Sequence, residues 1–380
     1  MKLSVKSIIA VFLCLICSLA ANFCVAQEIA IGVLLPLNGK MAIIGDVEKK
    51  AIEMAVQELK ASSPEQQTTF ALHFGDTMGD PGAARQAAMN LIDEHRVSIL
   101  IGGCSSSASL AIAQLAEEHS VPFLITTASA DKLTEMDLRF TFRLCLPVSE
   151  QSKPMFNLLS KVRGRKKVCI LREDSRYGRY ETRSIVRICR KTRALISDIV
   201  TYPVQDTLNE APYFPRLQKI SPDILLVISQ DSESVRVLAL AQVLDKPPRL
   251  IFCKGAPFLM VDTYLDAQST LDTIYTSSPW HQNAPYPGAQ GFAQRFYEMY
   301  GIVADYHAAQ AYAAIQVIVD AISRALSPDS ESIREALEQT DVMSIYGQVH
   351  FQSYGDKERQ SRPPMVLLRW SGEDLQPVPY

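Results

Sequence analysis

Small hydroxyl side chains follow two apolar segments of the chain, where they are suited to bind a polar or anionic group. The segment 99–101 (I-L-I) leads through Gly-Gly-Cys to Ser105, the first of three consecutive serines. The segment 121–125 (V-P-F-L-I) leads into a turn that contains Thr127 and Ser129. Hydroxyl groups both donate and accept hydrogen bonds, so both turns are candidate binding sites.

Each of these turns follows a predicted strand, and a helix is predicted between them. Residues 108–118 place apolar side chains about 3.6 positions apart, which is typical of an amphipathic helix. Short apolar runs suit strands buried in a parallel sheet, whose ligands lie beyond the carboxyl ends of the strands. Ser105 would open the helix, where free N–H groups favour an anion, although serine also serves simply as a cap there. We therefore expect a binding rim made of Ser105 and the turn Thr127–Ser129.

The same alternation extends along the chain and predicts two α/β lobes. Strand-like and helix-like segments alternate from 28 to 144, with Asp46 as the predicted cap of the first helix, and again from 168 to 276. This is the pattern of doubly wound parallel sheets. Segments at 146–149 and 277–279 interrupt the alternation and are predicted to cross between the lobes, with a ligand cleft between them. The expected division is 27–147 plus 279–350 for the first lobe and 148–278 plus 351–380 for the second.

The N-terminus has the features of a secretory signal. Lys2 and Lys6 precede a strongly apolar stretch, and Cys24-Val25-Ala26 fits a small-x-small cleavage site. We therefore expect 1–26 to be a signal peptide and the mature chain to be periplasmic. An uncleaved membrane anchor is the alternative, because the uncharged stretch is long enough to span a bilayer.

Composition and missing motifs argue against several classes of function. The chain has 41 acidic residues and 38 lysines and arginines, a net charge of −3 that argues against a nucleic-acid binder. The sequence contains no G-x-S-x-G elbow and no G-x-x-x-x-G-K-[ST] phosphate loop, and beyond residue 26 it has no pair of cysteines at zinc spacing. We expect neither catalysis nor a cofactor nor a metal site.

Several short motifs occur in an order that resembles the type I periplasmic solute-binding proteins. They are I-G-V-L-L-P-L-N-G, D-T-M-G-D-P-G-A-A, I-G-G-C-S-S-S, V-P-F-L-I-T-T-A-S, E-D-S-R-Y-G, Y-H-A-A-Q-A-Y and G-Q-V-H-F-Q-S-Y-G-D. The resemblance covers essentially the whole mature chain. Its closest branch is the leucine/isoleucine/valine-binding family of ABC importers, which also includes amide and urea binders. It implies two doubly wound lobes joined by a three-strand hinge, with the third crossing near Phe351–Tyr354.

The function implied by the resemblance is capture of a small polar solute, such as an amino acid, an amide or a related carboxylate. The partner would be an ABC transporter permease in the inner membrane, to which a monomer delivers the solute. The alternative is a sensor of the same fold that signals to a regulatory partner when the lobes close.

The resemblance also implies roles for individual residues. Ser105 matches the serine that holds a ligand carboxylate, and Thr127 matches a position whose backbone carbonyl accepts from a ligand ammonium. Ser129 matches a hydroxyl residue that contacts both groups. Tyr177 matches the tyrosine of the second lobe that closes over the ligand, although a surface role is equally compatible with the sequence. Trp280, beside a crossing, suits hinge packing or the lining of the cleft.

The chain departs from the family where an acidic residue is expected to neutralise the ammonium. That place, after the predicted strand at 250–253, reads Lys254-Gly255. Asp231 is a possible substitute, although it also suits a helix cap, and Glu173 and Asp174 are others. Otherwise the ligand has no ammonium and Lys254 faces a second acidic group. We therefore predict weak or absent binding of leucine, isoleucine and valine.

The cysteines are expected to be mainly buried and at least partly unpaired. Five of the eight lie beyond residue 26, and an odd number leaves at least one without a partner. Cys104 stands where some relatives of this family form a disulfide, but its expected partner position reads Gly79. The sequence thus predicts a free Cys104.

Overall fold

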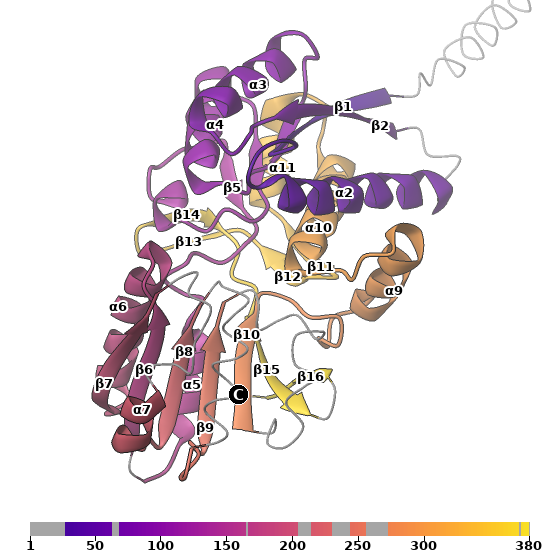
Figure 1. Ribbon diagram of the computed structural model, residues 1–380. Coiled ribbons are helices and arrows are strands. Elements are labelled where there is room, and N and C mark those ends of the chain that lie inside the picture. Colours follow the sequence, from indigo (N-terminus) through magenta and orange to yellow (C-terminus); the bar gives the residue numbers. More distant parts are fainter. Residues whose placement is uncertain are drawn as a thin grey trace, which may run out of the picture.

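The chain forms two α/β lobes, each built on its own twisted sheet (Figure 1). The computed structural model describes residues 27–62, 68–164, 166–203, 214–229, 244–255, 273–371 and 374–379. The predicted signal at 1–26 and Asp231 lie outside these ranges. The sequence also predicts helices at 232–244 and 256–265, of which only residue 244 lies within the described ranges.

The first sheet has the strand order β13-β14-β5-β4-β3-β1-β2. Its strands are β1 (Gln27–Leu35), β2 (Thr68–Asp76), β3 (Ile99–Gly102), β4 (Phe123–Ile125), β5 (Thr141–Arg143), β13 (Gln352–Tyr354) and β14 (Lys357–Gln360). All neighbours pair in parallel except β13 and β14. The apolar runs that predicted β1, β3 and β4 are buried, as expected for a parallel sheet covered on both faces.

Helices cover both faces of the first sheet. One face packs against the helices α2 (Ala42–Ser62), α9 (Ala289–Tyr300), α10 (Tyr306–Arg324) and α11 (Ser330–Glu338). The other face packs against α3 (Pro81–Asp93) and α4 (Ser106–His119). A hairpin of β11 (Asp341–Ser344) and β12 (Gly347–His350) follows α11. The doubly wound arrangement predicted for this lobe is thus confirmed.

The second sheet repeats the plan with the order β16-β15-β10-β9-β8-β6-β7. Its strands are β6 (Lys167–Glu173), β7 (Leu195–Tyr202), β8 (Ile224–Ile228), β9 (Leu250–Lys254), β10 (Ile274–Ser278), β15 (Val366–Ser371) and β16 (Asp374–Pro377). The helices described in this lobe are α5 (Lys153–Lys161), α6 (Arg176–Lys191) and α7 (Phe214–Ile220). β6 to β10 pair in parallel, whereas β15 and β16 are antiparallel additions that the sequence did not reveal as such.

The described strands place three crossings between the sheets, at 144–152, 279–288 and 361–365. The first contains the predicted break at 146–149, and the second begins at the last residue of the predicted break at 277–279, since Ser277 and Ser278 belong to β10. The third lies further along the chain than the expected 351–354, because β13 and β14 join the first sheet. The assignment of 352–360 to the second lobe was therefore wrong. The short, polar strands β13 and β14 carry no apolar alternation by which a sequence reading can find them.

Local sequence explains where several helices begin. Asp80 caps α3 by accepting hydrogen bonds from the backbone of Gly82 and Ala83, and Pro81 occupies the first turn, as predicted. Asp46 does not cap α2, which begins at Ala42; it lies inside the helix and pairs with Lys50 at 2.5 Å. That prediction was wrong because the helix begins four residues earlier, where the backbone N–H groups of Ala42 and Gly45 donate to the carbonyls of Gly39 and Met41.

Among the described residues, no helix is both long and apolar enough to cross a membrane.

Candidate functional site

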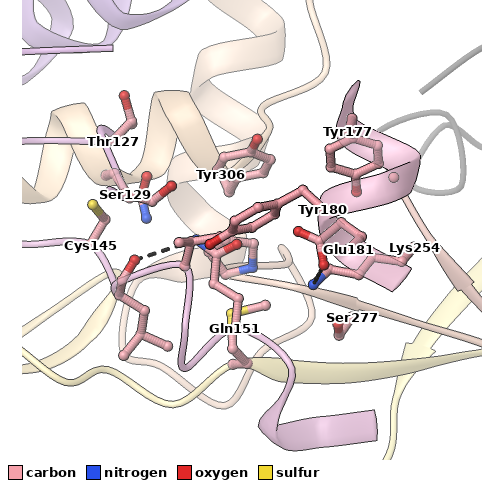
Figure 2. A pocket seen from close by; sticks show the side chains of 16 residues that line it. Thr127, Ser129, Cys145, Gln151, Tyr177, Tyr180, Glu181, Lys254, Ser277 and Tyr306 are labelled. Carbon is pink, nitrogen blue, oxygen red and sulfur yellow. Dashed lines mark hydrogen bonds and ion pairs between the residues drawn. The ribbon is translucent and has the colours of Figure 1, made fainter. Parts of the chain in front are cut away.

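A cavity of about 330 Å³ lies between the lobes, and both lobes and the crossings contribute to its wall (Figure 2). Its lining includes Thr127, Ser129, Cys145, Tyr306 and Gln310 from the first lobe and Tyr177, Tyr180, Glu181, Lys254, Gly255 and Ser277 from the second. Leu146, Val148, Gln151, Pro279 and Met365 of the crossings complete it. The volume is at the small end of the range typical of ligand sites, so the cavity suits a small solute.

The turn after β4 forms part of the first-lobe wall. Thr127 and Ser129 both line the cavity, as the sequence predicted, and Figure 2 shows them on the side opposite Tyr177, Glu181 and Lys254. The Thr127 hydroxyl does not serve the cavity, because it donates to Glu48 Oε1 at 2.8 Å. The Ser129 carbonyl accepts from the backbone of Val148 at 2.8 Å, which joins this turn to the first crossing.

Glu48 of α2 holds the ends of β3 and β4 together from behind the cavity. Its side chain is 0% exposed and accepts hydrogen bonds from the Thr126 hydroxyl at 2.8 Å and the Cys104 thiol at 2.9 Å, besides that of Thr127. Burial raises the pKa of Glu48, although the nearby His307 and the three hydrogen bonds act to lower it. The carboxyl group therefore holds the turn through three hydrogen bonds, while its burial disfavours the ionised form.

Arg143 supports the same turn from the end of β5. It is 0% exposed and donates to the Ala130 carbonyl, the Thr134 hydroxyl at 2.9 Å and Gln360 Oε1 at 2.5 Å. Gln360 in turn donates to the Cys145 carbonyl at 2.8 Å. Burial lowers the pKa of the Arg143 guanidinium. This network ties the Thr127–Ser129 turn to β14, immediately before the third crossing.

The first turns of α6 form the second-lobe wall. Tyr177, Tyr180 and Glu181 stand three or four residues apart, so they share one face of the helix, and all three line the cavity. Ser175 caps α6 by accepting from the Gly178 backbone at 3.0 Å. A Cβ on Gly178 would lie 2.3 Å from the Glu173 carbonyl oxygen, so only glycine lets the helix start this close to β6. Burial raises the pKa of Tyr177 well above its usual value, which keeps its hydroxyl protonated.

Lys254, at the end of β9, forms an ion pair with Glu181 inside this wall. Its Nζ lies 2.5 Å from Glu181 Oε2 and 2.9 Å from the Ser152 hydroxyl. The two side chains are 12% and 4% exposed, so the pair is largely shielded from solvent. The sequence reading that Lys254 lines the cleft agrees with this position, but its acidic partner is Glu181, which the sequence reading did not consider.

Two predicted site residues are not seen at the cavity. Ser105 caps α4, with its hydroxyl 3.1 Å from that of Ser107, and is not among the cavity-lining residues. Asp231 lies outside the described residues. The ligand contacts predicted for both, and for Thr127, Ser129, Tyr177 and Lys254, remain predictions.

The proposed acidic substitutes take up other positions. Glu173 is buried and accepts from the hydroxyls of Ser175 and Ser229, the latter at 2.9 Å. Asp174 is exposed and pairs with Arg179 at 2.6 Å. Trp280 is buried, donates to the Ile345 carbonyl at 2.9 Å and packs edge-on against Phe292, which agrees with hinge packing.

The cysteines of the described chain are all unpaired: Cys104, Cys145, Cys169, Cys189 and Cys253. The predicted free Cys104 is confirmed. Burial and the neighbouring Glu48 raise the pKa of its thiol well above the usual value, so it is not a reactive thiolate. Within the described ranges, no three His, Cys, Asp or Glu side chains are placed to hold a metal ion.

Comparisons with known proteins give a consistent result. A family model of periplasmic binding proteins matches residues 28–374. A curated relative is the Leu/Ile/Val-binding protein homolog 7 of Brucella melitensis, 23% identical over 369 residues, which cover 93% of this chain and 92% of that protein.

Solved structures show the same fold. The substrate-binding protein LivJ from Streptococcus pneumoniae, in complex with isoleucine, is 21% identical, with a TM-score of 0.71 over 92% of this chain and 98% of that one. A solute-binding protein of an ABC transporter from R. palustris, in complex with benzoate, is 18% identical, with a TM-score of 0.70 over 93% and 96%. These relatives are solute-binding proteins and not enzymes, and their ligands differ widely in chemistry.

Proposed function

Because the chain belongs to the periplasmic binding protein family, we propose that it captures a small polar solute between its two lobes and delivers it to an ABC importer. The observation that carries the proposal is the cavity of about 330 Å³, whose walls come from both lobes and from the crossings. A site divided in this way binds its solute most tightly when the lobes close, so the solute itself shifts the protein toward the closed state.

The proposed solute is an amino acid, an amide or a related carboxylate. Ser129 and the backbone around Thr127 supply hydrogen bonds from the first lobe, and Tyr177 and Tyr180 supply aromatic surface and hydroxyls from the second. We propose that Ser105, at the N-terminus of α4, joins the site when the lobes close. The N-terminal N–H groups of that helix suit a carboxylate.

Delivery follows from the closed form docking on a permease in the inner membrane, after export of the chain directed by residues 1–26. No chemical step is involved. The solute shifts the protein from the open to the closed state because its affinity for the two states differs. The relative from Streptococcus pneumoniae is described as part of a branched-chain amino acid transporter, which supports a transport role for this chain.

A thermal-shift screen tests the proposal, since a ligand that binds only the folded state raises the melting temperature. The panel contains amino acids, amides, urea and short mono- and dicarboxylates, and each hit is followed by calorimetry. We expect at least one class to stabilise the protein with one ligand per chain. The proposal fails if no solute of these classes binds, or if a bound solute is located outside the cavity between the lobes.

A further inference from the structure

Glu181 and Lys254 form an ion pair in the wall of the cavity. Of the residues lining the described part of the cavity, these two carry the side chains that are charged at neutral pH. At 2.5 Å they form one ion pair, and the Ser152 hydroxyl takes a second bond from Lys254. The described lining therefore combines a strong donor and a strong acceptor with no net charge.

Each partner has hydrogen-bonding capacity left. Glu181 uses Oε2 for the ion pair, and its other carboxylate oxygen makes no hydrogen bond to the described chain. The ammonium of Lys254 has three N–H donors and uses two of them in the described contacts. One acceptor and one donor thus stand side by side at the cavity wall.

A charged ligand group fits this wall poorly. A carboxylate at the free donor of Lys254 would lie beside the Glu181 carboxylate, and an ammonium at the free oxygen of Glu181 would lie beside the Lys254 ammonium. Either placement brings two like charges together in a site that is largely shielded from solvent, which is unfavourable. An apolar group fits no better, because it would cover the free donor and the free acceptor without offering either a hydrogen bond.

We propose that the Glu181–Lys254 pair selects solutes with an uncharged carboxamide or urea group, a specificity that rests on the proposed function. The carbonyl oxygen of such a group accepts from Lys254, and its N–H donates to Glu181. The ion pair stays intact and the net charge of the wall is unchanged. The hydroxyl-bearing side chains Tyr177, Tyr180 and Ser277 around the pair accommodate the rest of a polar ligand.

The test compares ligands of matched shape by calorimetry on the full mature chain. The pairs are glutamine with glutamate, asparagine with aspartate and with leucine, and benzamide with benzoate. We expect the amide of at least one pair to bind about tenfold more tightly, or better, than its acid and its apolar counterpart. Equal affinities, or a tighter acid, overturn the proposed selectivity while leaving the proposed solute capture in place. Binding of no compound in any class overturns both.

Variants assign the selectivity to the pair. Glu181→Gln frees Lys254, so the preference for the amide over the acid should fall about tenfold or reverse. The double variant Glu181→Gln/Lys254→Met removes the pair without leaving an unpaired charge, and it should bind both members of a ligand pair about equally. Asp174→Asn is the matched control, because it removes an exposed acid near the start of the same helix. An unchanged amide preference in the double variant, with a melting temperature near that of the wild type, overturns the assignment.

Discussion

At the scale of single residues, the site depends on side chains that never reach the cavity. Glu48 and Arg143 are fully buried, yet between them they bond to both sides of the Thr127–Ser129 turn. Helical spacing could have identified Glu48, because it lies on the same face of α2 as the buried Ala51, Ile52 and Ala55. The same reasoning applies to Glu181, one turn after Tyr177. Arg143 could not be recognised, because its partners Ala130 and Gln360 are far apart in the sequence.

The double variant Ser105→Ala/Ser129→Ala tests the hydroxyls of the first lobe. Loss of two hydrogen bonds to the solute should weaken binding by about 1–3 kcal/mol, which is roughly 5- to 150-fold. Calorimetry with the ligand identified in the screen measures the change. Unfolding in urea serves as the control, because loss of the Ser105 cap of α4 lowers the stability by about 1 kcal/mol on its own. Full affinity in a normally folded double variant would remove both serines from the site.

Glu48→Gln tests the buried carboxyl group through the pH dependence of stability. A folded-state pKa above the unfolded value of about 4.5 means that the folded protein holds this proton more tightly. The contribution of Glu48 to stability is therefore fully present below that value and is lost as the pH rises through the folded-state pKa. The stability of the wild type relative to Glu48→Gln should therefore fall as the pH rises above about 4.5. Urea unfolding across this range measures it, and a difference independent of pH would contradict the expectation.

At the scale of elements, α6 and β9 give the second lobe a polar wall at the place where they meet. The apolar run at 250–253 made β9 predictable to within a residue. The residues of β15 and β16 were assigned to the second lobe, but their antiparallel pairing was not predicted, and the polar pair β13–β14 was assigned to the wrong lobe. Pairing between distant segments leaves no local pattern in the sequence. The position of the cleft between the lobes was thus predictable from the sequence, whereas the Glu181–Lys254 ion pair in its wall was not.

The polar wall predicts that leucine, isoleucine and valine bind weakly or not at all. Their apolar side chains would cover the Glu181–Lys254 pair without satisfying its free donor and acceptor. Calorimetry with the three amino acids checks this, with Glu181→Leu/Lys254→Met as the comparison that should gain affinity for them. Micromolar binding of any of the three by the wild type would show the prediction to be wrong.

At the scale of the whole molecule, one acid joins the first and third crossings. Glu150 accepts from Arg362 at 2.9 Å and from the Tyr354 hydroxyl at 2.6 Å, and it also binds Lys153. The guanidinium of Arg362 stacks 4.0 Å from the centre of the Tyr354 ring. Burial acts to raise the pKa of Glu150, but these hydrogen bonds outweigh it and hold that pKa below its usual value.

Glu150→Gln should therefore destabilise the protein at neutral pH by about 1–3 kcal/mol. A lowered pKa means that the stabilisation is present above the unfolded value of about 4.5 and is lost as the pH falls through the folded-state pKa. The gap between wild type and variant should close in acid. Urea unfolding at neutral and acidic pH measures the gap, and Glu298→Gln, at an exposed acid of α9, is the control. A gap that persists in acid would rule out this explanation.

The order in which segments join the two sheets also bears on how the newly made chain behaves. The first sheet needs α9 and α10 to cover one face and β14 to complete an edge, and all three are synthesised after the second sheet has begun. The second sheet needs β15, which comes later still. A growing chain therefore cannot close the first core before β14 has been made, or the second core before β15 has been made. This late closure of both cores agrees with the export that we propose for the chain, since a chain crosses a narrow translocation channel while it is still unfolded.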